Sequence, residues 1–169
     1  AAVGGTLMDC PDPTLPVTGA VADSRVAAAG DLYVAIAGER VDGHDFAAAA
    51  HEAGAVVTLG TRPTGKPTIV VADDPVAALG RLASHVLAQL PGTRVVAITG
   101  SSGKTTTKDL VATLLEDLGP TVAPAGSFNT EVGLPLTVLR ATQDTRFLVL
   151  EMGARGIGHV ATLCRIAPP

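Results

Sequence analysis

The sequence predicts an α/β protein, in which a small N-terminal α/β domain precedes part of a Rossmann-like parallel-sheet domain with a phosphate-binding loop (P-loop). Two observations support this prediction. Short runs rich in Val, Ile and Leu alternate with segments of helical periodicity, as in strands joined by crossover helices. One such run, residues 94–99, leads directly into a glycine loop, Lys104-Thr105 and a helix. We place the domain boundary at Pro91-Gly92, giving domains of residues 1–91 and 92–169.

The N-terminal domain begins with a region rich in proline and glycine. Residues 1–30 are expected to form turns, after what reads as the tail of a helix at the start of the chain. A helix is predicted over 46–53 with Asp45 as its N-cap, and a second helix from Pro75 to Leu90 carries a clear apolar stripe. Apolar runs rich in β-branched residues predict strands at 31–37, 55–59 and 68–71.

The C-terminal domain continues the alternation of strands and helices. Its first helix, residues 104–118, is expected to pack through one apolar face made of Leu110, Val111, Leu114, Leu115 and Leu118. Further strands are predicted at 121–123 and 147–150, with helices near 131–139 and 158–166. Because the strands are parallel, their carboxyl ends should meet at one edge of the sheet, where α/β proteins bind ligands.

The strongest functional signal is the loop formed by Gly100, Ser101, Ser102, Gly103, Lys104, Thr105 and Thr106. In such loops backbone N–H groups and a helix N-terminus converge on phosphate oxygens. Lys104 is then expected to reach the β- and γ-phosphates of ATP, and the Thr105 hydroxyl to ligate Mg²⁺. Ile98 stands where the general pattern has its first glycine, so an ordinary turn before a helix is the alternative.

Two polar residues further along the chain should face the same crevice. Glu151 ends the predicted strand at 147–150, and a carboxylate there can hold Mg²⁺ directly or through water. The alternative is a helix-capping or salt-bridged glutamate. Asn129 lies in the loop before the short helix and either contacts a phosphate oxygen or shapes a turn. Lys104 and Glu151 are the catalytic candidates, because both act on the charge of a transferring phosphoryl group.

In the N-terminal domain the candidates are weaker. Asp23-Ser24-Arg25 is a compact polar triplet that reads either as a surface turn or as a site where Ser24 and Arg25 bind an anionic ligand. His44 either contacts that ligand or fills a turn.

Composition excludes several other classes of function. The net charge of −4 and the shortage of aromatic residues, one Tyr, three Phe and no Trp, argue against nucleic-acid binding. No apolar run reaches the roughly 18 residues of a membrane span, and no basic segment of the signal-peptide kind opens the chain. Cys10 and Cys164 are isolated thiols, which indicates a reducing, cytoplasmic location. The four histidines lack the spacing of zinc ligands.

Taken together, the motifs resemble the Mur ligases, the ATP-dependent amide-forming enzymes of peptidoglycan precursor synthesis. The loop 98–108 is similar to their ATP-binding loop, including the absent first glycine. Asp23-Ser24-Arg25, Gly30-Asp-Leu-Tyr-Val-Ala35 and Asp42-Gly-His-Asp-Phe46 resemble the uridine-nucleotide-binding domain of two members. The segments 126–137 and 151–155 resemble the member that adds D-alanyl-D-alanine.

The resemblance implies a reaction in the cytoplasm that serves cell-wall biogenesis, cell shape and cell division. ATP would phosphorylate the terminal carboxylate of UDP-N-acetylmuramoyl-tripeptide, and the amine of D-alanyl-D-alanine would attack the acyl phosphate. By position, residues 100–106 and Asn129 would bind ATP, Thr105 and Glu151 would serve Mg²⁺, and Ser24, Arg25 and His44 would bind the UDP substrate. The full-length enzyme is expected to be a monomer, without nucleic-acid or membrane partners.

Two features depart from the family pattern. Thr130 stands where the family has a second asparagine, which leaves the contacts of that position open. The chain also reads as a fragment, without the rest of the central domain and the C-terminal domain, and is expected to be inactive alone. The alternatives are a Mur-type ligase that adds diaminopimelate or lysine, a relative of folylpolyglutamate synthase, or a non-catalytic P-loop module that binds nucleotide.

Overall fold

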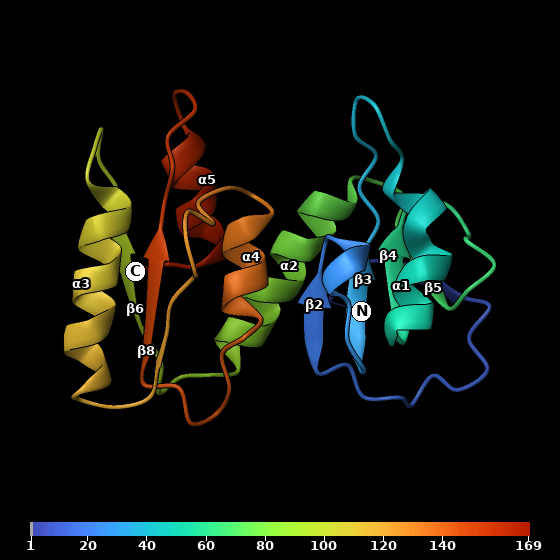
Figure 1. The fold of residues 1–169 in the computed structure, drawn as a ribbon, viewed down its shortest axis with the longest axis horizontal. Helices are drawn as coiled ribbons and strands as arrows, with labels where there is room; N and C mark the ends of the chain where they lie inside the picture. Colours follow the sequence, from blue (N-terminus) through green and yellow to red (C-terminus); the bar gives the residue numbers. More distant parts are fainter. Residues whose placement is uncertain (1) are drawn as a thin grey trace. The chain divides into compact units, whose positions relative to one another are not determined.

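The computed structural model describes residues 2–169 and divides the chain into two compact units (Figure 1). The first unit extends to Leu79, and the second runs from Gly80 to Pro169. Helix α2 (Pro75–Ala88) carries the chain from one unit to the other. Each unit has a sheet with parallel strands and covering helices, which confirms the predicted α/β class. The domain boundary at Pro91-Gly92, which lies beyond α2, stays a prediction.

The sheet of the first unit has five strands in the order β1-β5-β4-β3-β2. The strands β2 (Gly19–Val21), β3 (Asp31–Val34), β4 (Val57–Gly60) and β5 (Thr68–Val70) run parallel, and β1 (Thr6–Met8) pairs antiparallel with β5. Helix α1 (Ala47–Ala53) packs its buried alanines near Tyr33 and Ala35. Small side chains let the helix lie close to the sheet. Because β2, β3 and β4 are parallel, their carboxyl ends share one edge.

The structure corrects two expectations about this unit. Residues 6–8 and 19–21 form strands β1 and β2, where turns after a helix tail were expected. Strand β1 is only three residues long and all three are exposed, so its pairing with β5 is what defines it as a strand. Asp45 does not cap α1, because the N-cap residue of that helix is Phe46, which makes no side-chain capping hydrogen bond. The capping side chain in this region is Asp42, which caps the turn that precedes α1. Asp42 accepts a 2.9 Å hydrogen bond from His44 N, because a 3₁₀ turn, η2 (Gly43–Phe46), precedes the helix.

The sheet of the second unit has three parallel strands in the order β6-β8-β7. They are β6 (Arg94–Ile98), β7 (Thr121–Val122) and β8 (Phe147–Glu151), and Ile98 is in register with Glu151. Figure 1 shows α3 (Lys104–Glu116) on one side of this sheet, with α4 (Gly133–Val138) and α5 (His159–Ile166) on the other. The buried core joins β8, α4 and α5 to the end of α2 and includes Leu134, Leu148 and Leu163.

The packing face of α3 differs from the predicted one. Lys108 and Ala112 are buried against the unit, whereas Leu110, Leu114 and Leu118 are 62%, 69% and 60% exposed. The five predicted apolar residues span two rows of the helix surface, and only Val111 and Leu115 are partly buried. The pattern of apolar residues alone therefore does not specify which row of α3 meets the sheet.

None of the helices formed by residues 2–169 combines the length and the apolar character that crossing a bilayer requires.

Candidate functional site

The P-loop of the second unit follows β6 and ends at the first residue of α3. Gly103 has a φ of +73°, in the left-handed region that glycine adopts without strain, and this turn directs the chain into the helix. No side chain caps the start of α3. The free N–H groups of its first turn are therefore available to an anion such as phosphate.

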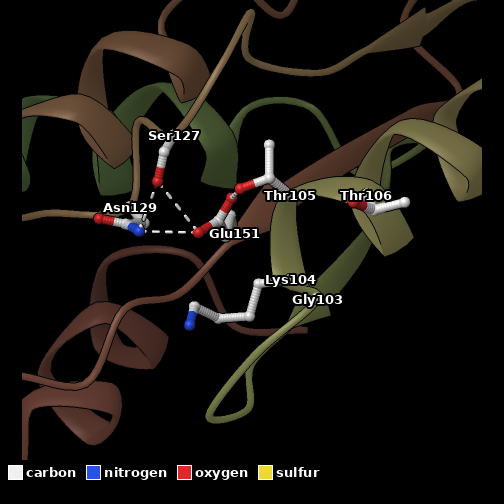
Figure 2. A pocket seen from close by; sticks show the side chains of 7 residues that line it. All are labelled: Gly103, Lys104, Thr105, Thr106, Ser127, Asn129 and Glu151. Atoms are coloured by element: carbon white, nitrogen blue, oxygen red, sulfur yellow. Dashed lines mark hydrogen bonds between the residues drawn. The ribbon is translucent and has the colours of Figure 1, made fainter.

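Lys104 is the first residue of α3, and its side chain bends back over the loop. Its Nζ donates a 2.8 Å hydrogen bond to Gly100 O. Figure 2 shows the side chain extending from the start of α3, with Lys104 and Glu151 both among the residues that line the pocket. The ammonium group is thus held at the mouth of the loop, where a phosphate oxygen can replace the carbonyl as its partner.

Glu151, at the end of β8, is the centre of the site. Its side chain is only 1% exposed, yet three donors surround the carboxylate (Figure 2). Thr105 Oγ1 donates to Oε2 at 2.8 Å, while Asn129 Nδ2 and Ser127 Oγ donate to Oε1 at 2.7 and 3.1 Å. A buried carboxylate with three hydrogen-bond donors is stable in its ionised form.

The electrostatic balance at Glu151 follows from these contacts. Burial by itself raises the pKa of Glu151. The hydrogen bonds from Asn129, Thr105 and Ser127, together with the positive charge of Lys104, outweigh burial and place the pKa below its ordinary value of 4.5. The group is therefore a carboxylate at neutral pH.

Hydrogen bonds to backbone carbonyls hold the three loops of the site together. Met152 N donates to Ile98 O at 2.9 Å, and Thr99 Oγ1 donates to Met152 O at 2.9 Å, which joins the ends of β6 and β8. Gly153 N donates to Asn129 O at 3.0 Å and ties the loop after β7 to the same edge. The parallel order β6-β8-β7 makes this possible, because all three loops leave the sheet at its carboxyl end.

An open pocket of about 340 Å³ lies between these loops. Its lining is polar and consists of Gly103, Lys104, Thr105, Thr106, Ser127, Asn129 and Glu151. Among residues 2–169 no group of three or more His, Cys, Asp and Glu side chains could hold a metal alone. The Thr105 hydroxyl and the Glu151 carboxylate are hard oxygen ligands, and they fit Mg²⁺, which commonly takes its other ligands from phosphates and water.

The structure brings six of the predicted site residues into this pocket: Gly103, Lys104, Thr105, Thr106, Asn129 and Glu151. Gly100, Ser101 and Ser102 lie in the exposed loop next to it. Ser127 was missed by sequence reasoning, although it stands two residues before Asn129 in a loop already expected to face the crevice. Thr130, the departure from the family pattern, accepts a 3.2 Å hydrogen bond from Gly133 N and so supports the start of α4.

The candidates of the first unit follow two neighbouring parallel strands. Ser24 and Arg25 come after β2, and His44 comes after β3. Arg25 is exposed and forms a 2.6 Å ion pair with Asp23. Hydrogen bonds from Arg25 lower the pKa of Asp23 to about 2. The guanidinium group therefore lies at the carboxyl edge of the sheet, with its direction set by Asp23.

His44 is buried at the same edge, and both of its ring nitrogens have partners inside the unit. Thr61 N donates to Nε2 at 2.9 Å, so Nε2 accepts and the neutral ring carries its proton on Nδ1, 2.6 Å from Asp42 Oδ1. Hydrogen bonds from His44, first the backbone N–H and then the ring, lower the pKa of Asp42, and Arg62 lowers it further. His44 thus joins the loops that follow β3 and β4.

Comparisons with known proteins agree with this geometry. A family model described as "Mur ligase family, catalytic domain" matches residues 16–90, and one described as "Mur ligase middle domain" matches residues 98–169. The UDP-N-acetylmuramoyl-tripeptide--D-alanyl-D-alanine ligase of Mycobacterium leprae is 49% identical over 99% of this chain and 38% of its own length. The chain thus spans well under half the length of this curated relative.

Solved structures show the same likeness. A crystal structure of MurF from Acinetobacter baumannii matches 99% of this chain and 37% of its own, with 34% identity and a TM-score of 0.88. The MurF ligase of Thermotoga maritima in complex with ADP matches 94% of this chain and 37% of its own, with 40% identity and a TM-score of 0.77.

Proposed function

The chain belongs to the Mur ligase family, and we propose on this premise that it carries the nucleotide-binding parts of a ligase that joins D-alanyl-D-alanine to UDP-N-acetylmuramoyl-tripeptide. The observation that carries the proposal is the buried Glu151 carboxylate, held at 2.8 Å by Thr105 of the P-loop helix. An acidic group fixed against a phosphate-binding loop is the arrangement that a magnesium nucleotide requires. The relatives named as ligases of this substrate supply the specificity of the proposal.

In the proposed reaction ATP transfers its γ-phosphoryl group to the terminal carboxylate of the tripeptide. The carboxylate oxygen forms a bond to phosphorus as the bond to ADP breaks, which gives an acyl phosphate. The amine of D-alanyl-D-alanine then forms the amide bond, loses a proton and displaces inorganic phosphate. Activation is needed because a free carboxylate is a poor electrophile.

The residues of this chain have defined parts in that proposal. The N–H groups of residues 100–106 bind phosphate oxygens, and Lys104 leaves Gly100 O to stabilise charge on the transferring group. Thr105 and Glu151 would hold Mg²⁺, which supplies Lewis-acid stabilisation of phosphate charge when it is bound. Asn129 and Ser127 keep the Glu151 carboxylate in place.

The first unit would bind the UDP part of the substrate. Ser24 and Arg25 lie at the carboxyl edge of its sheet, and the exposed guanidinium can bind a diphosphate. His44 would contribute by shaping this site, because the hydrogen bond that its ring accepts from Thr61 N holds the loops at the same edge. Cys10 and Cys164 are free thiols, in keeping with the proposed cytoplasmic location.

The proposal is tested by calorimetric titration of the chain with ATP and Mg²⁺. Lys104→Ala should weaken binding about tenfold or more, since it removes a charge-assisted contact to phosphate. Lys66→Ala, which removes a lysine from the first unit, serves as the matched control and should bind like the wild type. Equal affinities of wild type and Lys104→Ala would overturn the P-loop assignment.

A further inference from the structure

Lys108 is a fully buried lysine one helical turn after Lys104. Its side chain has 0% exposure and does not line the pocket. Taking an ammonium group out of water is costly unless each of its protons finds an acceptor. A lysine in this position therefore has a structural or functional reason to be there, and its partners identify that reason.

The ammonium group of Lys108 has three acceptors for its three protons. Nζ lies 2.5 Å from Pro124 O, 3.2 Å from Gly126 O and 2.6 Å from Asp109 Oδ1. Asp109 is the next residue of the same helix, but the two carbonyls belong to the loop after β7. Lys108 thus connects the P-loop helix to that loop through two hydrogen bonds from one charged group.

The bonded carbonyls lie in the same loop as the residues that hold Glu151, and Gly126 immediately precedes the first of them. Ser127 and Asn129, one and three residues after Gly126, donate to Glu151 Oε1, while Thr105, three residues before Lys108, donates to Oε2. Helix α3 therefore controls both oxygens of the carboxylate. It holds Oε2 directly through Thr105, and it holds Oε1 through Lys108 and the loop.

We propose that Lys108 is a positioning residue that anchors the loop 124–129 so that Ser127 and Asn129 orient Glu151 for a magnesium nucleotide. The inference rests on the proposed function for its ligand, and on the contacts of Lys108 for its mechanism. When a residue that orients a metal ligand without touching the metal is lost, the affinity for the metal typically falls by 10- to 100-fold.

The first measurement requires no nucleotide. Gly153 N donates to Asn129 O, whereas the neighbouring Met152 N donates to Ile98 O inside the sheet edge. Amide hydrogen exchange followed by NMR thus reports loop anchoring at Gly153, with Met152 as an internal control. In Lys108→Met, Gly153 should exchange about tenfold faster, while Met152 keeps its wild-type rate.

The second measurement is the gain in ATP affinity on adding Mg²⁺, taken as a ratio of dissociation constants with and without the ion. Lys108→Met should reduce this gain about tenfold, because Glu151 is no longer oriented. Binding without Mg²⁺ should persist, since residues 100–106 do not depend on the loop. A general loss of structure would weaken both forms of binding instead.

A second variant covers the case in which Lys108→Met does not fold. Gly126 has a φ of +74° and open space around its missing Cβ, so Gly126→Ala strains only the backbone that presents the bonded carbonyl. Gly65→Ala is its matched control, since Gly65 has a φ of +72° and equally open surroundings in the first unit. Gly126→Ala should reproduce both effects, and Gly65→Ala neither.

The outcomes separate this inference from the function on which it rests. If the wild type binds no ATP, the proposed function fails, and faster Gly153 exchange still supports anchoring by Lys108. Two results in a folded Lys108→Met variant would overturn the inference. One is a Gly153 amide that exchanges at the wild-type rate, and the other is a gain in ATP affinity on adding Mg²⁺ that equals that of the wild type.

Discussion

Thr105 Oγ1 donates a 2.8 Å hydrogen bond to Glu151 Oε2 and thereby joins the first turn of α3 to the end of β8. The two residues are 46 positions apart in the chain. They meet because β6 and β8 are adjacent and parallel, with Ile98 in register with Glu151. This contact brings the hydroxyl and the carboxylate proposed for Mg²⁺ into one place.

Thr105→Val tests this contact with little change in volume. The valine keeps the shape but removes the hydroxyl, so one proposed Mg²⁺ ligand and one donor to Glu151 are lost. We expect the gain in ATP affinity on adding Mg²⁺ to fall about 10- to 100-fold in calorimetric titrations. Thr113→Val, on the exposed side of the same helix, should leave the gain unchanged. If Thr105→Val keeps the wild-type gain in ATP affinity on adding Mg²⁺, Thr105 does not take part in the proposed site.

Glu151→Gln should change how stability depends on pH. The folded pKa of Glu151 is below 4.5, so its ionised form stabilises the wild type above that value. This contribution is lost as the pH falls from about 4.5 through the lower folded pKa, because protonation breaks the arrangement of three donors.

The measurement is the free energy of unfolding by denaturant at pH 7 and at pH 3. The variant lacks the titrating group, so the wild type should exceed it in free energy of unfolding by less at pH 3 than at pH 7. Other carboxyl groups titrate in both proteins and cancel in the difference. An advantage that is the same at both pH values would contradict the lowered pKa.

His44→Ala should destabilise the first unit. It removes the acceptor of the Thr61 N–H and leaves a cavity at a buried position, with an expected cost of about 2 to 4 kcal/mol in the free energy of unfolding. The exposed His85→Ala is the control, and it should change stability by less than about 0.5 kcal/mol. Similar stabilities for the two variants would mean that the ring of His44 does not organise this edge.

Arg25→Ala tests the proposed UDP site without touching the core. The side chain is exposed, and its removal should weaken binding of UDP in a titration about tenfold, through the loss of a contact to phosphate. The pKa of the Asp23 carboxyl, followed by NMR, should rise from about 2 toward its ordinary value of 3.8. If the pKa of Asp23 rises but the affinity for UDP does not change, Arg25 does not bind the nucleotide.

The phosphate-binding loop and its two distant partners illustrate what local pattern can predict. Residues 100–106 were predicted because strand, glycine loop, Lys-Thr and helix are consecutive in the chain. Glu151 and Asn129 were predicted because each follows a parallel strand, and parallel strands end at the same edge. Strands β1 and β2 are missed because each is only three residues long, which is too short for a periodic pattern of apolar residues to be recognised.

Consecutive residues and strand order encode the α/β class, the phosphate-binding loop and the carboxylate expected near it. Three other features became known only from the folded chain: which face of α3 is buried, how Ser127 joins Asn129 on Glu151, and where the ammonium group of Lys108 lies. These features depend on tertiary contacts because a buried polar group is placed by partners distant in sequence. A lysine reads as a surface residue until the carbonyls that accept its protons are known.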